Sequence, residues 1–424
     1  MKASIIPEHT QTRMDNTGFM VRLFRTGLIK RFQSLQSGQI ILREENKEMR
    51  FGEPNQAFPT PVTIHVDSMN FYTELALGGS VGAGEAYIHG LWSCDDLTLL
   101  TRILLRNRHT LDAMDSSLSR FKAPAHKFLH WLNRNTRDGS RRNIESHYDL
   151  GNQLFELFLD ETMMYSSAIY EDPSHDLDQA AFAKIDRICK KLDLKPEDRV
   201  LEIGTGWGGF AIHAAKHYGC HVTTTTISRA QYEHARQRVE EEGLSDRIEL
   251  LMADYRDLEG RYDKLVSIEM IEAIGHQYLD TYFQTCSRLL NDHGMMLLQA
   301  ITIADQRYEQ AKTSIDFIKR FIFPGGFLPS VTAMADSITR RTDMRIYHLE
   351  DIGEHYATTL RHWRERFLQR IGEVKHLGYP DSFVRMWEFY MSYCEGGFLE
   401  RVIGTAQILL IKPDNRRAPI TPRL

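Results

Sequence analysis

A short run near the middle of the chain limits the fold more than any other part of the sequence. Residues 200–210 read Val-Leu-Glu-Ile-Gly-Thr-Gly-Trp-Gly-Gly-Phe, an apolar strand followed by alternate glycines and then by a predicted helix over 210–217. Glycine adopts the left-handed conformations of a tight strand–helix turn, and its missing side chain lets backbone N–H groups approach a ligand. Such turns open the nucleotide sites of doubly wound α/β sheets. A tight turn without a ligand has the same pattern, so the run alone leaves both interpretations open.

The spacing of this turn differs from that of a dinucleotide site. The glycines follow an E-x-G-x-G-x-G pattern that begins at Glu202, whereas the dinucleotide fingerprint is G-x-G-x-x-G. A carboxylate directly before the loop suits a cationic, phosphate-free ligand better than NAD. The run therefore resembles the S-adenosylmethionine loop of the doubly wound methyltransferases.

The second half of the chain alternates predicted strands with predicted helices, which favours a parallel sheet. Ser228-x-x-Gln231 is typical of a capping box that opens one of these helices, and Gly243 is placed to end it. A helix over 178–192 precedes the first strand. The predicted strands are 199–203, 221–227, 247–251, 262–268 and 294–301.

Ligands of doubly wound sheets lie across the carboxyl ends of the strands, and three such ends carry suitable side chains here. Glu202 ends the first strand, residues 226–228 with Gln231 follow the second, and residues 254–256 follow the third. We predict that Asp254 accepts a hydrogen bond from an adenine amino group and that Tyr255 stacks on the ring. The ribose contact comes from Gln231 or a hydroxyl. The alternative is that Asp254 only starts a turn.

Two carboxylates follow the fourth strand. Glu269 and Glu272 are three residues apart on a predicted helical turn, so they share one face. A carboxylate at the start of a helix is favoured by the helix dipole, which explains one glutamate more easily than two. We therefore interpret the pair as candidate chemistry.

The N-terminal part is predicted to be a small α+β domain. A basic amphipathic helix over 18–35 precedes short strands at 39–42, 49–51 and 62–66, a flexible glycine-rich turn at 78–87 and a helix at 97–108. A basic stretch follows at 123–143. Both basic segments suit either a solvated face or an anionic membrane surface.

The composition excludes several classes of protein. The net charge is −5, so bulk electrostatics do not predict nucleic-acid binding. The five cysteines are odd in number and form no C-x-x-C pair, which argues against a disulfide scaffold, a zinc ribbon or another metal site and favours a reducing cytosol. No apolar run of about 18 residues and no signal peptide is present. We expect a cytoplasmic protein without a membrane span.

Ordered motifs along the chain resemble those of the cyclopropane-fatty-acid synthase family, whose members use S-adenosylmethionine. The resemblance extends over nearly the whole chain beyond about residue 38. Besides the glycine loop, the motifs are GSVGAGEAY at 79–87 before Trp92, SHYDLGN at 146–152, MYSSA at 164–168, DYRD at 254–257, MIEAIG at 270–275, FIFPGG at 321–326 with LPS at 328–330, and I-x-x-x-Y-x-TTL-x-x-W at 352–363.

The resemblance implies a fold, a reaction and a cofactor. The fold is α/β, a doubly wound, mostly parallel seven-stranded methyltransferase sheet with the small α+β N-terminal domain. The reaction is methyl transfer from S-adenosylmethionine to the cis double bond of a phospholipid acyl chain, after which loss of a proton from the new methyl closes a cyclopropane. The residues that the resemblance and the strand ends assign to the cofactor are Tyr165, Ser166, Glu202, Gly204, Thr205, Gly206, Trp207, Gly208, Thr226, Ile227, Ser228, Gln231, Asp254, Tyr255 and Arg256.

The family's base is implied to be a bound bicarbonate, and the chain departs from its binding set at two positions. The set carries over to Glu272, Ile301 and Tyr356, but Ser167 stands where the bacterial enzymes commonly have cysteine and Gln299 where they have histidine. Neither replacement titrates near neutral pH. Glu269 stands where those enzymes usually have glycine, so either bicarbonate is retained or Glu269 takes over as base. These departures resemble a branch that leaves the product open: a cyclopropane, or a methyl-branched or methylene chain.

The predicted organisation follows from these assignments. It comprises a basic amphipathic segment at 1–37, a lipid-associating domain at 38–121, a basic linker at 122–143, and a methyltransferase domain at 144–424 with helical acyl-chain-binding insertions. The expected partners are an anionic phospholipid bilayer at the inner face of the membrane and a second copy of the chain in a homodimer. Two other functions stay open, namely methylation of a soluble small molecule and a non-catalytic lipid-binding or scaffold role. Candidates for an apolar channel, or for plain core, are Phe321, Phe323, Phe327, Trp363, Phe367, Trp387, Phe389 and Tyr390.

Overall fold

The computed structural model describes residues 18–108 and 150–420. The chain divides into two compact units, each built from several segments. The first contains Met1–Leu132, Ser314–Pro324 and Phe367–Val402, and the second contains Asn133–Thr313, Gly325–Arg366 and Ile403–Leu424. The whole of the predicted linker at 122–143 and part of the SHYDLGN motif lie outside the described residues. Our domain boundaries stay a prediction, but two segments from the second half of the chain group with the N-terminal unit.

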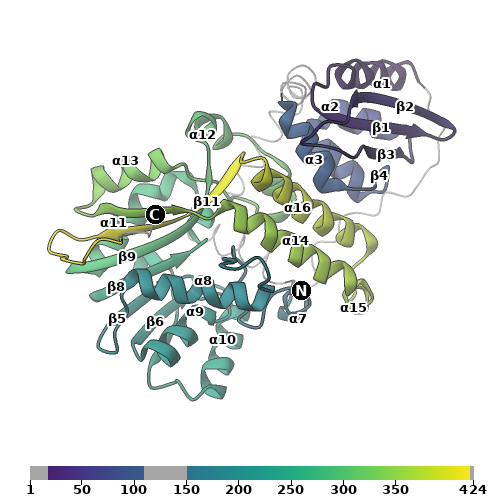
Figure 1. Ribbon diagram of the computed structural model, residues 1–424. Helices are drawn as coiled ribbons and strands as arrows, with labels where there is room; N and C mark the ends of the chain where they lie inside the picture. The colour runs from purple at the N-terminus through teal and green to yellow at the C-terminus, as the bar shows by residue number, and fades with distance from the viewer. Residues whose placement is uncertain (1–17, 109–149, 421–424) are drawn as a thin grey trace. The chain divides into compact units, whose positions relative to one another are not determined.

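The first unit is a small α+β fold, as predicted (Figure 1). Its sheet has the order β2-β1-β3-β4, in which β1 pairs antiparallel with β2 and parallel with β3. The strands are β1 (Gly38–Glu44), β2 (Lys47–Glu53), β3 (Val62–Val66) and β4 (Trp92–Cys94). The helices are α1 (Phe19–Phe32), α2 (Asn70–Ile88), α3 (Leu97–Arg106), α15 (Ile371–His376), α16 (Asp381–Leu399) and a π-helical turn, Ile318–Ile322.

The prediction of a flexible turn at 78–87 was wrong, because these residues lie within α2. The helix kinks at Gly79, where φ is 58° and ψ is −138°. A Cβ atom at Gly82 would lie 2.1 Å from the Glu74 carbonyl oxygen, and one at Gly84 would lie 2.3 Å from the Phe317 ring. These glycines therefore permit close packing rather than chain flexibility.

The second unit is built on a seven-stranded sheet of order β10-β11-β9-β8-β5-β6-β7, which confirms the predicted methyltransferase sheet. Strands β5 to β9 run parallel, whereas β11 is antiparallel to both β9 and β10. The strands are β5 (Arg199–Ile203), β6 (His221–Thr226), β7 (Ile248–Met252), β8 (Tyr262–Ile268), β9 (Leu290–Ile303), β10 (Arg345–Asp351) and β11 (Ile403–Ile411).

Helices lie on both faces of this sheet (Figure 1), and an apolar cluster packs against each face. Alternate residues of β5 separate them, since Val200 belongs to one cluster and Leu201 and Ile203 to the other. The cluster that contains Val200 includes residues of α8 (Leu177–Leu192), α9 (Gly209–His213), the π-turn Ala214–Tyr218 and α10 (Arg229–Glu241). The cluster that contains Leu201 includes residues of α11 (Leu279–Leu289) and α13 (Val331–Arg341). The remaining helices are α7 (Asn152–Glu156), α12 (Asp305–Ala311), α14 (Gly353–Gln369) and the 3₁₀ turns Tyr255–Asp257, Ile271–Ala273 and His276–Tyr278.

The strand order reverses next to β5, which is where doubly wound folds bind their ligands. From β5 the chain proceeds outward through β6 and β7, and then returns to the other side of β5 with β8. The glycine loop follows β5, and Glu269 follows β8 directly. The fold thus brings the two groups that the sequence singled out to one edge of the sheet. Over residues 18–108 and 150–420, no helix is both long and apolar enough to cross a membrane.

Candidate functional site

The glycine loop after β5 is a tight turn with one open side. Gly204, Gly206 and Gly208 have φ values of 103°, 53° and 88°. The N–H groups of Gly204 and Thr205 both donate to the Thr225 carbonyl at 3.0 Å, which ties the loop to the end of β6. A Cβ atom at Gly204 would meet Met270 Cγ at 3.1 Å, whereas one at Gly206 would meet open space. The loop therefore has room for a ligand against the backbone of Gly206.

Glu202 lies beneath this loop rather than on its open side. It is 2% exposed, and its carboxylate accepts a hydrogen bond from Thr224 Oγ1 at 2.6 Å. Burial raises the pKa of Glu202 to about 8. The assignment of Glu202 to the cofactor stays a prediction.

The second strand end forms a closed set of hydrogen bonds. Thr226 Oγ1 donates to Gln231 Oε1 at 3.0 Å, and Gln231 N donates to Ser228 Oγ at 3.3 Å. Half of the predicted capping box is therefore present, while the Gln231 side chain is bound to Thr226 instead. Ile227 lies between these residues and is partly buried.

At the third strand end, Asp254 binds Arg256. The Asp254 carboxylate accepts from Arg256 Nε at 2.8 Å and Nη2 at 2.6 Å. Tyr255 is 9% exposed and packs edge-on against Tyr282 with ring centroids 5.6 Å apart. The predicted contacts of Asp254 and Tyr255 with adenine stay predictions.

Aromatic residues adjoin the glycine loop. Tyr165 packs against Trp363 with ring centroids 5.2 Å apart, and Trp207 packs against Phe155 at 4.9 Å. Trp207 Nε1 donates to Asn152 Oδ1 at 2.8 Å. Because Trp207 is 2% exposed, its ring supports the loop from within.

Three of the predicted catalytic residues donate hydrogen bonds to the carboxylate of a fourth, Glu269. Its Oε1 accepts from Ser167 N at 3.0 Å and from Gln299 Nε2 at 2.8 Å. Its Oε2 accepts from the Tyr356 hydroxyl at 2.8 Å. The backbone of Glu269 is left-handed, with φ 49°, a conformation that favours glycine and costs other residues free energy. Its N–H donates to the Gln299 carbonyl at 2.8 Å, which holds this conformation.

Opposing effects act on the pKa of Glu269. Burial raises the pKa, while the hydrogen bonds from Gln299, Ser167 and Tyr356 and the positive charge of Lys184 lower it. Lys184 is fully buried, and its Nζ donates to Ser166 Oγ at 2.8 Å. Burial is the largest of these effects, so the pKa of Glu269 is raised overall, and the three donors offset part of the cost of desolvating the ionised form.

Glu272 and Ile301 form a second pair beside the first. Ile301 N donates to Glu272 Oε1 at 2.5 Å, whereas the buried Oε2 has no hydrogen-bond partner among the described residues. Burial, followed by the negative charge of Glu269, raises the pKa of Glu272 to about 8. The two neighbouring carboxyl groups thus lie in different surroundings, Glu269 with three donors and Glu272 with one, a difference of the kind that acid–base sites use.

Sequence reasoning missed three buried polar residues next to this site, Lys184, Lys191 and Gln407. Gln407 Nε2 donates to Gln299 Oε1 at 3.0 Å, and Lys191 Nζ donates to Gln407 Oε1 at 2.7 Å. The sequence did contain a signal for the two lysines. Both lie on the apolar face of the helix 177–192, where a charged residue is unusual and predicts a buried lysine. No motif marks Gln407.

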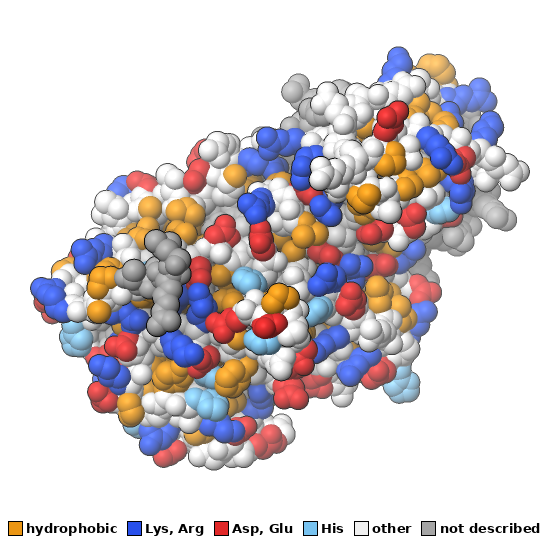
Figure 2. Space-filling view, in the orientation of Figure 1, with side chains coloured by type: hydrophobic (Ala, Val, Ile, Leu, Met, Phe, Trp, Pro, Cys, Tyr) orange, Lys and Arg blue, Asp and Glu red, His pale blue; other side chains and the backbone are white. Residues whose placement is uncertain are grey.

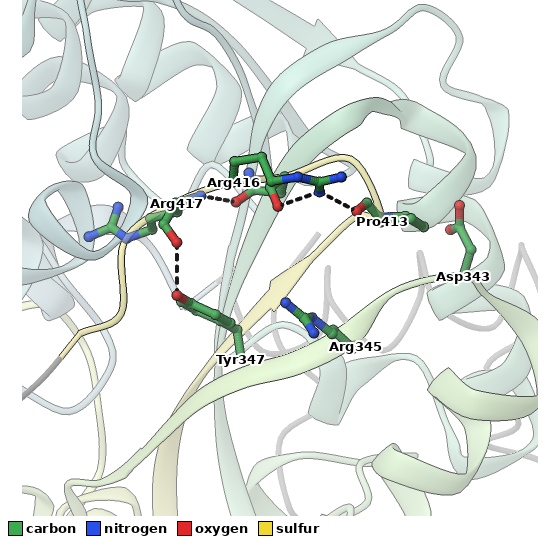
Figure 3. Close-up of a pocket in the computed structure, with 7 residues that line it drawn as sticks. Asp343, Arg345, Tyr347, Pro413, Arg416 and Arg417 are labelled. Carbon is green, nitrogen blue, oxygen red and sulfur yellow. Dashed lines mark hydrogen bonds between the residues drawn. The ribbon is translucent and has the colours of Figure 1, made fainter.

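A basic pocket of about 600 Å³ lies at the other end of the sheet (Figure 3). It is lined by Arg345 at the start of β10 and by Arg416 and Arg417 after the end of β11. In β11, Ile411 pairs with Arg345, while Gln407, four residues earlier, pairs with Gln299. This pocket is therefore separate from the group around Glu269.

Comparison with known proteins identifies the family. Residues 135–408 match the family model of mycolic acid cyclopropane synthetase. The chain is 40% identical over 352 residues to the tuberculostearic acid methyltransferase UfaA1 of Mycobacterium tuberculosis, covering 79% of each chain. It is 36% identical over 357 residues to the cyclopropane-fatty-acyl-phospholipid synthase of Escherichia coli, covering 82% of this chain and 87% of that one.

Solved structures agree with these matches. The mycolic acid cyclopropane synthase CmaA1, crystallised with SAH and CTAB, superposes with a TM-score of 0.60 and 29% identity, covering 64% of this chain and 98% of that one. The cyclopropane synthase MmaA2 from Mycobacterium tuberculosis gives the same TM-score at 28% identity. With the methyltransferase sheet and the open glycine loop, these matches show that the chain belongs to the cyclopropane synthase family and is an S-adenosylmethionine-dependent methyltransferase that acts on lipids.

Proposed function

We propose that the protein transfers a methyl group from S-adenosylmethionine to the cis double bond of an unsaturated phospholipid acyl chain, with Glu269 as the base. The observation that carries the proposal is the set of three donors to the Glu269 carboxylate. Ser167, Gln299 and Tyr356 belong to the set that the family resemblance assigned to bicarbonate. In this chain, a carboxylate of the protein itself accepts their hydrogen bonds.

The glycine loop fits the cofactor, because the space beside Gly206 is open and the loop is closed at Gly204. When bound, S-adenosylmethionine supplies an electrophilic methyl group on a sulfonium. The residues that would hold it are those of the glycine loop, with Gln231 and Asp254 at the next two strand ends. An ionised Glu269 adds negative charge near a cationic ligand.

After the double bond has received the methyl group, the acyl chain carries a positive charge, and a base must remove a proton to neutralise it. The π electron pair forms the new C–C bond, the S–CH₃ pair stays on sulfur, and a cation remains on the neighbouring chain carbon. Glu269 takes a proton from the added methyl, and the released C–H pair closes the ring. An ionised carboxylate in a desolvated site both stabilises the cation and accepts its proton.

A second candidate is the same transfer with a methyl-branched or methylene product. Loss of a proton from a chain carbon leaves a methyl-branched alkene, whereas a hydride shift to the cation, followed by loss of a proton from the added methyl, leaves a methylene chain. The relative with 40% identity supports this candidate, because it is a tuberculostearic acid methyltransferase rather than a cyclopropane synthase. The two candidates share cofactor, substrate and base. They differ in which proton the Glu269 carboxylate takes and in whether a hydride first moves to the cation.

We expect that incubating the protein with methyl-labelled S-adenosylmethionine and vesicles of unsaturated phosphatidylglycerol transfers the label to the acyl chains. Proton NMR and mass spectrometry of the released fatty acids then separate ring protons from branched or methylene signals. Fully saturated phosphatidylglycerol vesicles are the matched control and should stay unlabelled. Absence of label across lipids and pH, with S-adenosylmethionine still bound, would instead favour a soluble substrate or a non-catalytic role.

We further propose that α1 docks on an anionic bilayer. Phe19, Met20 and Leu23 are 80%, 53% and 52% exposed, and the basic Arg22 and Lys30 are exposed on the same helix. Hydrophobic and basic side chains also share the visible face of the unit that carries α1 (Figure 2). This combination suits a lipid surface better than water. A homodimer and a location at the inner face of the membrane remain part of this proposal.

Replacing Phe19, Met20 and Leu23 together by serine should weaken binding to phosphatidylglycerol vesicles by about tenfold or more, since each buried apolar side chain contributes about 1.5–3 kcal/mol. Cosedimentation measures the bound fraction. A control variant with Ile346 and Leu349 of β10, which are 38% and 41% exposed, changed to serine should bind normally. Equal binding of both variants would contradict the docking role of α1.

A further inference from the structure

A row of hydrogen-bonded, buried polar side chains leads from Glu269 to the ion pair between Glu350 and Arg187. Gln299 donates to Glu269 Oε1, Gln407 donates to Gln299 Oε1, and Lys191 donates to Gln407 Oε1, at 2.8, 3.0 and 2.7 Å. Gln299 and Gln407 are 0% exposed and Lys191 is 6% exposed. At its outer end Lys191 also contacts Glu350, which binds Arg187. The row therefore connects a surface ion pair to the proposed base.

The two ends of the row determine the direction of every hydrogen bond in it. A lysine ammonium can only donate, and an ionised carboxylate can only accept. Gln407 must turn its oxygen to Lys191 and its NH₂ to Gln299, so Gln299 must turn its own NH₂ to Glu269. Without the ammonium, both amides could flip together. The Gln299 oxygen would then face the Glu269 carboxylate and the Ser167 carbonyl, to which Gln299 Nε2 also donates at 3.3 Å.

The position of Lys191 argues that it has a role beyond packing. Burying an ammonium is costly unless it is well paired, and burial lowers the pKa of Lys191 while Glu350 raises it. The neighbouring Lys190 is 72% exposed and pairs with Asp186 on the helix surface. The same helix thus carries one lysine in the ordinary solvated setting and one buried against Gln407.

We propose that Lys191 and Gln407 are positioning residues that orient the Gln299 amide and thereby hold Glu269 in its ionised, proton-accepting form. This inference rests on the proposed function of Glu269 as the base. It assigns to two residues that do not contact Glu269 directly a role in the protonation of the site.

Other charged or titratable groups also face Glu269. Lys184 of α8, Glu272 beyond β8 and Tyr356 of α14 each act on its ionisation. At the far end, Glu350, Arg187 and His348 surround Lys191. The row differs from all of these groups because it acts on Glu269 only through the orientation of the Gln299 amide. A substitution that preserves side-chain volume but reverses the direction of a hydrogen bond in the row should therefore change the pKa of Glu269.

The test compares Lys191→Met and Gln407→Glu with Lys190→Met as the matched control. Gln407→Glu keeps the size of the side chain and its contact with Lys191, but as a carboxylate it cannot donate to Gln299. Gln407→Leu serves as the apolar counterpart. Melting temperature and affinity for S-adenosylhomocysteine are measured for each variant, and only variants that match the wild type in both are compared further.

Two measurements report on Glu269. The first is the pH dependence of its carboxyl C=O infrared band, identified as the band that Glu269→Gln removes. The second is the pH profile of kcat on unsaturated phosphatidylglycerol vesicles. In Lys191→Met and Gln407→Glu, the pKa of Glu269 should rise by about one unit or more, because the ionised form loses a hydrogen bond. The acid limb of kcat moves to higher pH by the same amount, and kcat below that limb falls about tenfold, while Lys190→Met leaves both unchanged.

The two readouts distinguish failure of this inference from failure of the proposed function. If kcat falls at all pH values without a shift of the acid limb or the infrared titration, the residues are only structural and the inference is wrong. If the wild type labels no lipid, the proposed substrate is wrong, and the infrared titration alone tests the inference. A raised pKa of Glu269 in Lys191→Met and Gln407→Glu then supports the positioning role, and an unchanged pKa overturns it. If Lys191→Met and Gln407→Glu fail to fold, Gln407→Leu decides by the same criteria.

Discussion

Replacing Glu269 with glutamine is expected to lower kcat for methyl transfer to phospholipid by about 10²- to 10⁴-fold, the contribution typical of a general base. Glutamine keeps the length of the side chain and the left-handed backbone at φ 49° but cannot take a proton. Initial rates of label transfer to unsaturated phosphatidylglycerol vesicles measure the loss. Affinity for S-adenosylhomocysteine should change little, because the glycine loop is untouched.

Two companion variants sharpen this prediction. Glu249→Gln, at an exposed position in β7, is the matched control and should keep full activity. Glu269→Gly removes the base and relieves the left-handed strain, worth about 1–2 kcal/mol, so it should be inactive yet melt at a higher temperature than Glu269→Gln. Added bicarbonate should restore part of its activity, since the donors from Ser167, Gln299 and Tyr356 remain. Near-normal turnover of Glu269→Gln would refute Glu269 as the base.

Gly206→Ala should weaken binding of S-adenosylmethionine by about tenfold or more, equivalent to about 1.4 kcal/mol or more. The protein alone has room for the new methyl group, because a Cβ atom there meets open space. The cost to the free protein is only the left-handed backbone at φ 53°, about 1–2 kcal/mol. If the cofactor lies against this backbone, the alanine methyl group occupies space that the cofactor needs. Isothermal titration calorimetry measures the affinity.

Gly243→Ala separates this effect from backbone strain. Gly243 has a φ of 67°, and a Cβ atom there also meets open space, but it lies in the turn after α10. Both variants should lose similar stability, and only Gly206→Ala should lose affinity. If the two variants bind S-adenosylmethionine equally well, the cofactor does not lie against the loop at Gly206.

The parts of the fold that could be predicted are those encoded by local patterns. The strand ending at Glu202 and the glycine turn after it were predicted, because an apolar run and glycines at alternate positions belong to contiguous sequence. Strands 199–203 and 262–268 agree with the structure residue for residue. The α2 helix was mispredicted, because Gly82 and Gly84 read as chain breakers while the Glu74 carbonyl and the Phe317 ring, which exclude a side chain there, are invisible in the local sequence.

The site was predictable as a set of residues but not as a geometry. The family resemblance named Ser167, Gln299 and Tyr356, yet left open whether they hold bicarbonate or Glu269. In the structure they donate to Glu269, and that contact depends on a backbone angle at Glu269 that no propensity indicates. Lys191 and Gln407 were missed because they are 216 positions apart in the chain, and only the pairing of β11 with β9 brings Gln407 next to Gln299.

The position of β11 in the sheet has a consequence for the order of synthesis. Strand β11 is the last strand among the described residues, yet it lies between β9 and β10 and not at an edge. While a ribosome is still adding residues before Ile403, β9 has one side without a partner, and Gln299 has no amide behind it. Chains emerge from their N-terminus and fold as segments become available. Translation of β11 is thus the step that completes the sheet and the surroundings of Gln299, so a nascent chain that stops short of it should lack the finished site.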